Sequence, residues 1–284
     1  MLNCIKMDLY RMFRMKSFYM IWIILAAATI FTTSMSVIDY NMLKEEAQSS
    51  TQTVQQESAS QEEPVNLGMD VTIPTQPGEQ VTLYDLSYAS LHGKLIALFM
   101  VIFAVLFSSS DVSSGYVKNI GGQMKNRGNL VLSKAVALFI YTILTMIFYL
   151  VIQAIAQAAC FHELQIGAVR DFAAYAGTQT LLHYALLLIC MAVTVIIRNN
   201  VFSMTFGILF CMNVMVILYS AVDKVAAKLG FNDFVLLRYT VTGRMALLDM
   251  APSAKACGEA LAVAIVLGAA VTILSSQIFR KRDI

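Results

Sequence analysis

The residues with the most distinctive pattern occupy positions 108–134, between two apolar stretches, and read SSSDVSSGYVKNIGGQMKNRGNLVLSK. Asp111, Ser113 and Ser114 have side chains that can cap the start of a helix, and Gly121-Gly122 would end that helix. A short polar helix held between two apolar segments is suited to being pushed by a soluble partner. We therefore expect this segment to transmit force, not to catalyse a reaction.

Sequence motifs of enzymes and nucleotide-binding proteins are missing. No Walker A pattern G-x-x-x-x-G-K-[ST] occurs, and His162-Glu163 is followed by Ile166 where the zinc-protease motif H-E-x-x-H needs a second histidine. The odd number and scattered positions of the cysteines exclude a disulfide framework and a metal cluster. They are Cys4, Cys160, Cys190, Cys211 and Cys257. We expect this chain to have no catalytic residues, to hold no metal or cofactor and to bind no nucleic acid.

The composition excludes a soluble protein. Of the 284 residues, 58% are hydrophobic and only 13% are charged, and the mean hydropathy is +0.68. Soluble domains carry about 25% charged residues, so there is too little polar surface here to cover a soluble fold. The sequence predicts an all-α integral membrane protein.

Six apolar stretches set the predicted membrane topology, because a spanning helix needs about 20 apolar residues. The second stretch reaches that length only if residues 89–94 form its outer end, with Lys94 extending to the lipid headgroups. The predicted spans are residues 18–38, 93–110, 131–155, 174–197, 201–220 and 256–279. The first is retained, since its apolar run exceeds the 7–15 residues of a signal peptide.

Lys and Arg residues orient these spans. Most of them lie in the N-terminal 17 residues, in segment 111–130 and near Lys134, in the turn 198–200 and in the tail 280–284. The positive-inside rule then places both termini in the cytoplasm, with the protein crossing the membrane several times. Segments 39–92, 156–173 and 221–255 are the predicted outer connections.

Three of the segments outside the predicted spans also have sequence patterns that predict local structure. Residues 1–17 show helical spacing of apolar residues and predict an amphipathic helix in the membrane interface; the alternative is a simple extension of the first span. Within 39–92, the acidic, Ser- and Gln-rich part 44–63 predicts disorder, and 66–86 predicts a short β-hairpin. Segment 221–255 predicts two short helices that enter the outer leaflet without crossing it.

With this layout, the sequence resembles the membrane (permease) subunits of type-2 ABC exporters. Asp111 closes the second span, Gly-Tyr-Val-Lys-Asn follows, Arg127 comes later and a Ser-Lys pair at 133–134 opens the third span. The resemblance implies a coupling helix that docks into a separate ATPase. The implied coupling residues are Asp111, Ser113, Ser114, Gly115, Tyr116, Val117, Lys118, Asn119, Arg127 and Lys134.

The same resemblance implies partners, cofactors and a substrate route. ATP and Mg²⁺ would be bound by the ATPase, and a second permease copy or close relative would complete the pathway between the second and fifth spans. The implied wall residues are Phe99, Phe103, Phe107, Phe206, Phe210 and Asn213. The implied substrate is an amphipathic one such as an antimicrobial peptide, lantibiotic or toxin peptide, as for small permeases of Gram-positive bacteria; lipid, drug and ion export stay open.

One alternative function remains open beside the exporter. The chain could be a non-transporting sensor or scaffold whose acidic outer segment 39–92 binds a ligand, although a charge run is more often a solvated tether. His183 and Asn213 lie inside predicted spans, and we expect His183 to make an interhelical hydrogen bond. No Asp, Glu, Lys or Arg falls near the middle of a span, which disfavours an ion-coupled transporter.

Overall fold

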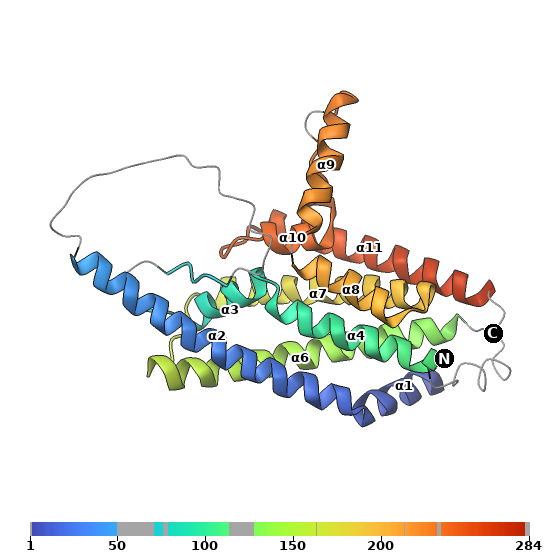
Figure 1. The fold of residues 1–284 in the computed structure, drawn as a ribbon, viewed down its shortest axis with the longest axis horizontal. Coiled ribbons are helices and arrows are strands. Elements are labelled where there is room, and N and C mark those ends of the chain that lie inside the picture. Colours follow the sequence, from blue (N-terminus) through green and yellow to red (C-terminus); the bar gives the residue numbers. More distant parts are fainter. Residues whose placement is uncertain are drawn as a thin grey trace.

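The computed structural model describes residues 2–49, 71–75, 79–113, 128–162, 164–212, 214–231 and 234–281. These residues form helices, and no strand occurs among them, which confirms the all-α prediction. The helices make an elongated bundle, and both chain ends lie at the same end of it (Figure 1). The helices are α1 (Leu2–Arg14), α2 (Lys16–Ser49), α3 (Leu83–His92), α4 (Leu95–Ser113), α6 (Asn129–Phe161), α7 (Val169–Ile197), α8 (Asn200–Cys211), α9 (Met215–Lys228), the 3₁₀ turn η2 (Leu236–Tyr239), α10 (Val241–Leu247) and α11 (Ala254–Lys281).

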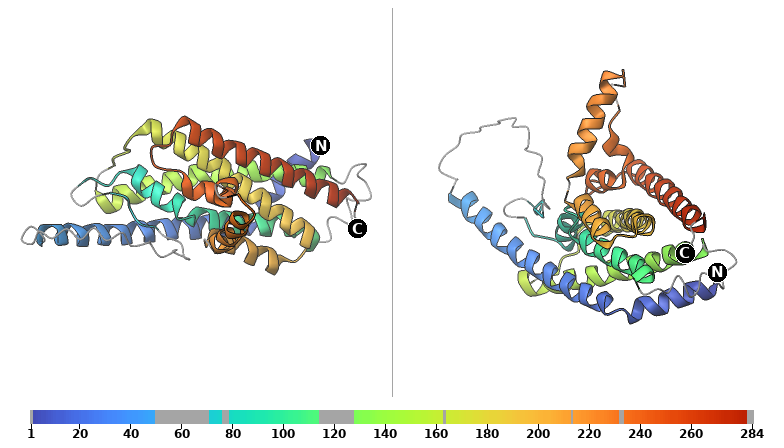
Figure 2. Two further views of the ribbon diagram at one scale, coloured as in Figure 1. Left: turned by 90° about the horizontal axis from the view of Figure 1, so that it is seen from above. Right: turned by 45° about the vertical axis from the view of Figure 1, so that its right-hand side comes forward.

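Helices α4 and α7 form the centre of the bundle. Helices α8 and α11 pack on α7, while α1 and α2 pack on α6. Helices α6 and α7 therefore lie between the first two helices of the chain and α11. The two further views in Figure 2 agree with this arrangement and show α9 standing away from the bundle. The most buried side chains come from α4 and α7, because these two helices have neighbours on most sides.

Within the part of the chain that the structure describes, four helices are long and apolar enough to cross a membrane: the Lys16–Met42 part of α2, and α6, α7 and α11. Two bent pairs raise the total to six if each pair crosses as one span. Helices α3 and α4 meet at 52°, and α8 and α9 meet at 73°. The chain is therefore compatible with a multi-pass membrane protein with four to six spanning elements.

The β-hairpin expected at 66–86 is wrong in its last part, because Leu83 begins helix α3. Thr82 caps this helix: its Oγ1 accepts from the Asp85 backbone N–H, and the Asp85 carboxylate accepts from the Thr82 N–H at 2.8 Å. This reciprocal capping box satisfies two backbone donors and fixes the helix start. Residues 71–75 and 79–82 are irregular, and the remainder of the expected hairpin lies outside the described residues.

The expectation of disorder from residue 44 onward is also wrong at its start. The backbone of α2 continues as helix through Ser49, and positions 50–63 lie outside the described residues. Residues 44–48 are Lys, Glu, Glu, Ala and Gln, all of which favour helices. Their intrinsic preference extends α2 beyond the apolar stretch.

The fifth predicted span, 201–220, is not one straight helix. Helix α8 ends at Cys211, and α9 starts at Met215 in a different direction. Contacts with the following segment hold α9 there, since Tyr219 hydrogen-bonds Thr242 and the Leu236 N–H donates to Asp223 at 2.8 Å. Part of the expected outer segment 221–255 is thus the end of α9, followed by η2 and α10.

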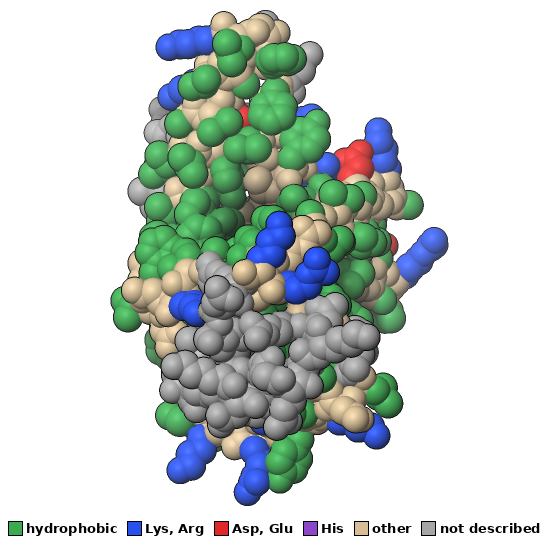
Figure 3. All heavy atoms as spheres, turned by 90° about the vertical axis from the view of Figure 1, so that its right-hand side faces the viewer, with side chains coloured by type: hydrophobic (Ala, Val, Ile, Leu, Met, Phe, Trp, Pro, Cys, Tyr) green, Lys and Arg blue, Asp and Glu red, His purple; other side chains and the backbone are tan. Residues whose placement is uncertain are grey.

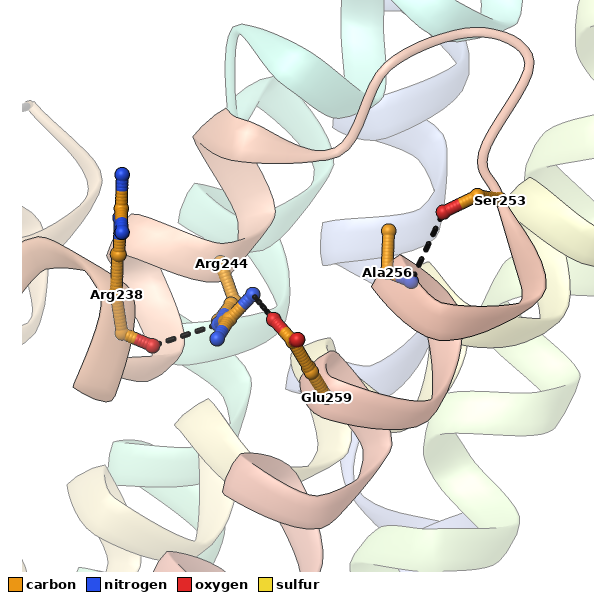
Figure 4. Close-up of polar contacts among 5 residues, drawn as sticks. All are labelled: Arg238, Arg244, Ser253, Ala256 and Glu259. Atoms are coloured by element: carbon orange, nitrogen blue, oxygen red, sulfur yellow. Dashed lines mark hydrogen bonds and ion pairs between the residues drawn. The ribbon is translucent and has the colours of Figure 1, made fainter.

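Arg244 ties this outer segment to α11. Its guanidinium donates to the Arg238 carbonyl oxygen at 2.6 Å and to Glu259 Oε2 at 2.9 Å, as Figure 4 shows. At the start of α11, Ser253 Oγ accepts from the Ala256 N–H at 3.1 Å, which caps the helix. Arg244 of α10 therefore links η2 to α11.

Candidate functional site

The structure describes both ends of the predicted coupling segment 111–130. Helix α4 carries the chain to Ser113, and the described chain resumes at Gly128, just before α6. Asp111 and Ser113 lie in the last turn of α4, where the backbone alone is described. Seven predicted coupling residues lie outside the described residues: Ser114, Gly115, Tyr116, Val117, Lys118, Asn119 and Arg127.

Three side-chain contacts, which we call the anchor contacts, join α1, the end of α4 and the start of α6. Arg11 Nη2 donates to Ser110 Oγ at 3.0 Å. Ser133 Oγ donates to the Asp8 carboxylate. Lys134 Nζ donates to the Phe107 carbonyl oxygen at 3.4 Å and lies 5.0 Å from the centre of the Phe107 ring. Helix α1 thus contacts the helix before the coupling segment, at Ser110, and the helix after it, at Ser133.

Two of the three anchor contacts, those of Asp8 and Lys134, are buried although they include charged groups, whereas the Arg11–Ser110 contact is half-buried. Asp8 is 1% exposed and Lys134 is 4% exposed. Burying a charge costs several kcal/mol unless hydrogen bonds or opposite charges compensate it. A hydrogen bond to a charged group contributes about 1.5–3 kcal/mol, so these contacts favour one fixed arrangement of the three helices.

An aromatic cluster continues from the anchor contacts into the bundle. The Phe103 ring stacks on Phe107 at 5.8 Å and on Tyr141 at 4.0 Å between ring centres, and Phe18 of α2 packs edge-on against Phe103 at 5.7 Å. Close packing makes such an interior stiff. The end of α4 is therefore packed closely against α2 and α6 through these rings.

The surface around this end of the bundle is basic. Figure 3 shows Lys and Arg side chains distributed over the end-on face of the molecule. The exposed basic residues of the elements that end here are Lys6, Arg14, Lys16, Arg198, Arg280 and Lys281. Positive charge of this kind suits a surface beside anionic lipid headgroups or an acidic protein partner.

The predicted pathway residues do not form one wall. Phe103 and Phe107 are completely buried inside the chain, so in this conformation they contact neither lipid nor a second copy. Phe99 is half-buried, and Phe206 and Phe210 are half-buried neighbours on α8, 4.7 Å apart. Asn213 lies outside the described residues.

Helices α4 and α8, which carry these phenylalanines, approach each other closely at Gly207. A Cβ atom at that position would lie 2.3 Å from Val101 Cγ1. Only glycine allows this approach without moving α8. The predicted second and fifth spans are therefore direct neighbours within one chain.

The buried glutamines of α6 contact other segments of the chain, Gln153 on α2 and Gln157 at the irregular stretch 79–82, whereas His183 bonds within its own helix. Gln153 Nε2 donates to Thr33 Oγ1 at 3.0 Å, and Gln157 Nε2 donates to the Val81 carbonyl oxygen at 3.0 Å. His183 Nδ1 pairs with the Gln179 carbonyl oxygen of its own helix at 2.7 Å. The interhelical bond expected for His183 is therefore wrong, because one turn of α7 supplies its partner.

Sequence reasoning missed Asp8. The predicted interfacial helix directs basic residues to lipid headgroups, but in the structure α1 packs on α6 through buried Asp8 and Met12, and Arg11 points to Ser110. The signal that was available is that Asp8 is the first acidic residue of a basic segment. A lone carboxylate on such a helix indicates a specific partner.

The described part of the chain contains no group of three or more His, Cys, Asp or Glu residues that could hold a metal ion. Its cysteines are all free thiols, and Cys190 and Cys211 are buried. No curated protein matches the sequence. Residues 67–284 match the model of a family described as "Protein of unknown function (DUF2705)". Because this match covers most of the chain, the protein belongs to the DUF2705 family.

Proposed function

We propose that the protein is the permease subunit of an ATP-binding cassette exporter, paired with a separate ATPase subunit and a second permease copy or close relative. It would cross the bacterial plasma membrane with both termini in the cytoplasm. The observation that carries the proposal is that α1 is hydrogen-bonded to the two helices that flank segment 111–130, at Ser110 of α4 and at Ser133 of α6. A loop that only orients a protein does not need buried charged groups, here Asp8 and Lys134, to fix the helices that flank it.

The mechanism follows from these fixed ends. ATP and Mg²⁺ bind to the ATPase subunits, which close and push the segment around residues 113–119. Lys134 and Ser110 pass the displacement to α6 and α4, and the aromatic cluster passes it to α2. Helix α1 keeps the ends of α4 and α6 together, so that the push moves the helices and does not deform the loop.

The substrate would leave along the surface of α8, near the second copy. This helix presents Phe206 and Phe210, and its exposed apolar residues include Val201, Phe202 and Leu209. An adaptable apolar wall suits an amphipathic peptide. An antimicrobial peptide, lantibiotic or toxin peptide fits this chemistry best, and the acidic outer segment would attract cationic peptides.

One observation favours the second candidate, a sensor that binds a ligand outside the cell. A hollow of about 440 Å³ on the side of the predicted outer segment is lined by Glu79, Asp85 and Asp171 together with Tyr84. Three carboxylates around one hollow suit a cationic group. The two functions predict opposite sensitivities of the coupling segment and the outer segment.

Growth of the native host in a gradient of the lantibiotic nisin separates them. We expect Gly115→Pro and Lys118→Glu to lower tolerance as far as deletion of the gene does, while removal of residues 50–63 leaves tolerance unchanged. Membrane insertion is checked by the amount of tagged protein in the membrane fraction. The reverse pattern would establish the sensor, and a gene deletion without effect would contradict export of this peptide class.

A further inference from the structure

Lys94 is a buried cation at the junction of two bent helix pairs. It lies between α3 and α4, is 2% exposed, and does not extend to the headgroups as the sequence suggested. Burial of a lysine inside an apolar bundle is costly and marks a functional position in membrane proteins. The expected headgroup contact is wrong because the bend turns Lys94 toward α9 and α10.

The backbone at Lys94 is strained in the way that functional sites often are. Lys94 has a φ of +61°, in the left-handed region, while the adjacent Gly93 has a φ of −69°. A glycine would take the left-handed conformation with less strain. Hydrogen bonds from the Lys94 N–H to Leu91 and from the Leu98 N–H to the Lys94 carbonyl, both 3.1 Å, hold this turn.

A cavity of about 150 Å³ lies against Lys94, where α9 leaves the bundle (Figure 1). Its polar residues, Lys94, Tyr219 and Thr242, are all buried, and the two hydroxyl groups lie 3.0 Å apart. Its remaining lining residues are apolar and half-buried: Phe210, Met215, Val216, Leu237 and Ala246. The cavity therefore has a polar floor and apolar walls nearer the surface.

This arrangement defines the chemistry of a ligand. Among the described residues, the lining contains one cationic residue and no acidic one, so it favours an anion. Lys94 also has a polar or electrostatic contact within the chain, but an ammonium group has three donors and can bind an anion in addition. The volume holds about five groups of the size of a water molecule, enough for a small headgroup and a few methylenes.

The geometry points to a binding site for a single-chain anionic amphiphile, with its carboxylate or phosphate head on Lys94, Tyr219 and Thr242 and its tail between the apolar walls. The head accepts hydrogen bonds from the ammonium and a hydroxyl group. The tail continues along α9, where Ile217, Leu218 and Val225 are exposed. This site does not depend on the proposed transport function.

The test measures binding of radiolabelled dodecanoate to the purified full-length chain in phosphatidylcholine nanodiscs. We expect saturable binding that Lys94→Met weakens by about 10- to 100-fold, because a charge-assisted hydrogen bond is lost. Tyr219→Phe and Thr242→Val should weaken binding by about 3- to 10-fold. Lys228→Met, which removes an exposed lysine of α9, should leave binding unchanged.

A second variant keeps the test decisive if Lys94→Met elutes as an aggregate. Ala246→Leu fills the cavity and leaves Lys94 in place, and we expect it to abolish dodecanoate binding. Competition identifies the ligand class: dodecyl phosphate should compete, whereas dodecanol, acetate and inorganic phosphate should not. Equal competition by dodecanol, equal competition by acetate or inorganic phosphate, or normal binding by Ala246→Leu would overturn the proposal.

Discussion

Replacing Asp8 by Ala is expected to release α1 from the start of α6. The carboxylate accepts a hydrogen bond from Ser133 in a buried site, and loss of such a bond costs about 1.5–3 kcal/mol. Cys4 lies one turn earlier on α1 and is half-buried. In a background where Cys4 is the only cysteine, the rate of maleimide labelling should rise by about 10- to 100-fold.

Two matched variants control this experiment. Asp8→Asn keeps an oxygen that accepts from Ser133 and should label more slowly than Asp8→Ala. Arg14→Ala removes an exposed side chain that pairs with Tyr10 of the same helix at 2.9 Å, and it should label at the rate of the parent protein. Equal labelling of Asp8→Ala and the parent would contradict the role of Asp8 in holding α1.

Substituting Gly243 by Ala is expected to lower the melting temperature by about 2–10 °C. The new Cβ would lie 2.0 Å from the Leu237 carbonyl oxygen and 2.7 Å from its carbonyl carbon, so η2 and α10 would have to separate. Overpacking of this kind costs about 1–3 kcal/mol, and the contact here is with backbone that does not yield easily. Thermal unfolding in detergent measures the effect.

The control for this substitution is Gly258→Ala in α11. A Cβ atom at Gly258 has no neighbour within 4 Å, and the position is exposed and helical. Alanine favours helix over glycine by about 0.5–1 kcal/mol, so the melting temperature should stay equal or rise. If both variants melted at the same temperature, the close approach of η2 and α10 would be wrong.

The helices were predictable wherever local sequence decides them. Long runs without charged residues predicted α6, α7 and α11, because about 20 apolar residues in a row indicate a membrane-spanning helix. The turn between α7 and α8 was also predictable: Arg198 takes a left-handed conformation and the Asn199 side chain caps α8 at the Val201 N–H, 3.0 Å away. The capping box at Thr82 and Asp85 was readable too, but the alternating pattern obscured it.

The details that depend on long-range contacts were not predictable. An apolar helix such as α4 does not show in its sequence which face is buried, so the interior position of Phe103 and Phe107 was missed. The break before α9 depends on Thr242, which is distant in the sequence. Asp8 and Ser110 belong to the site because α1 packs on α6; the acidic residue in a basic segment indicates that Asp8 has a partner, but it does not identify Ser133 as that partner.

The most direct test of the coupling account is mass spectrometry of the proteins that co-purify with the tagged chain from its native host in mild detergent. If the chain is an exporter permease, we expect a stoichiometric ATPase with a Walker A motif. We expect this ATPase to be lost when residues 113–119 are replaced by a Gly/Ser linker of equal length. Removal of residues 50–63 should leave the ATPase bound. Absence of any ATPase, even after mild cross-linking, would contradict the proposal that this chain couples to an ATPase through segment 111–130.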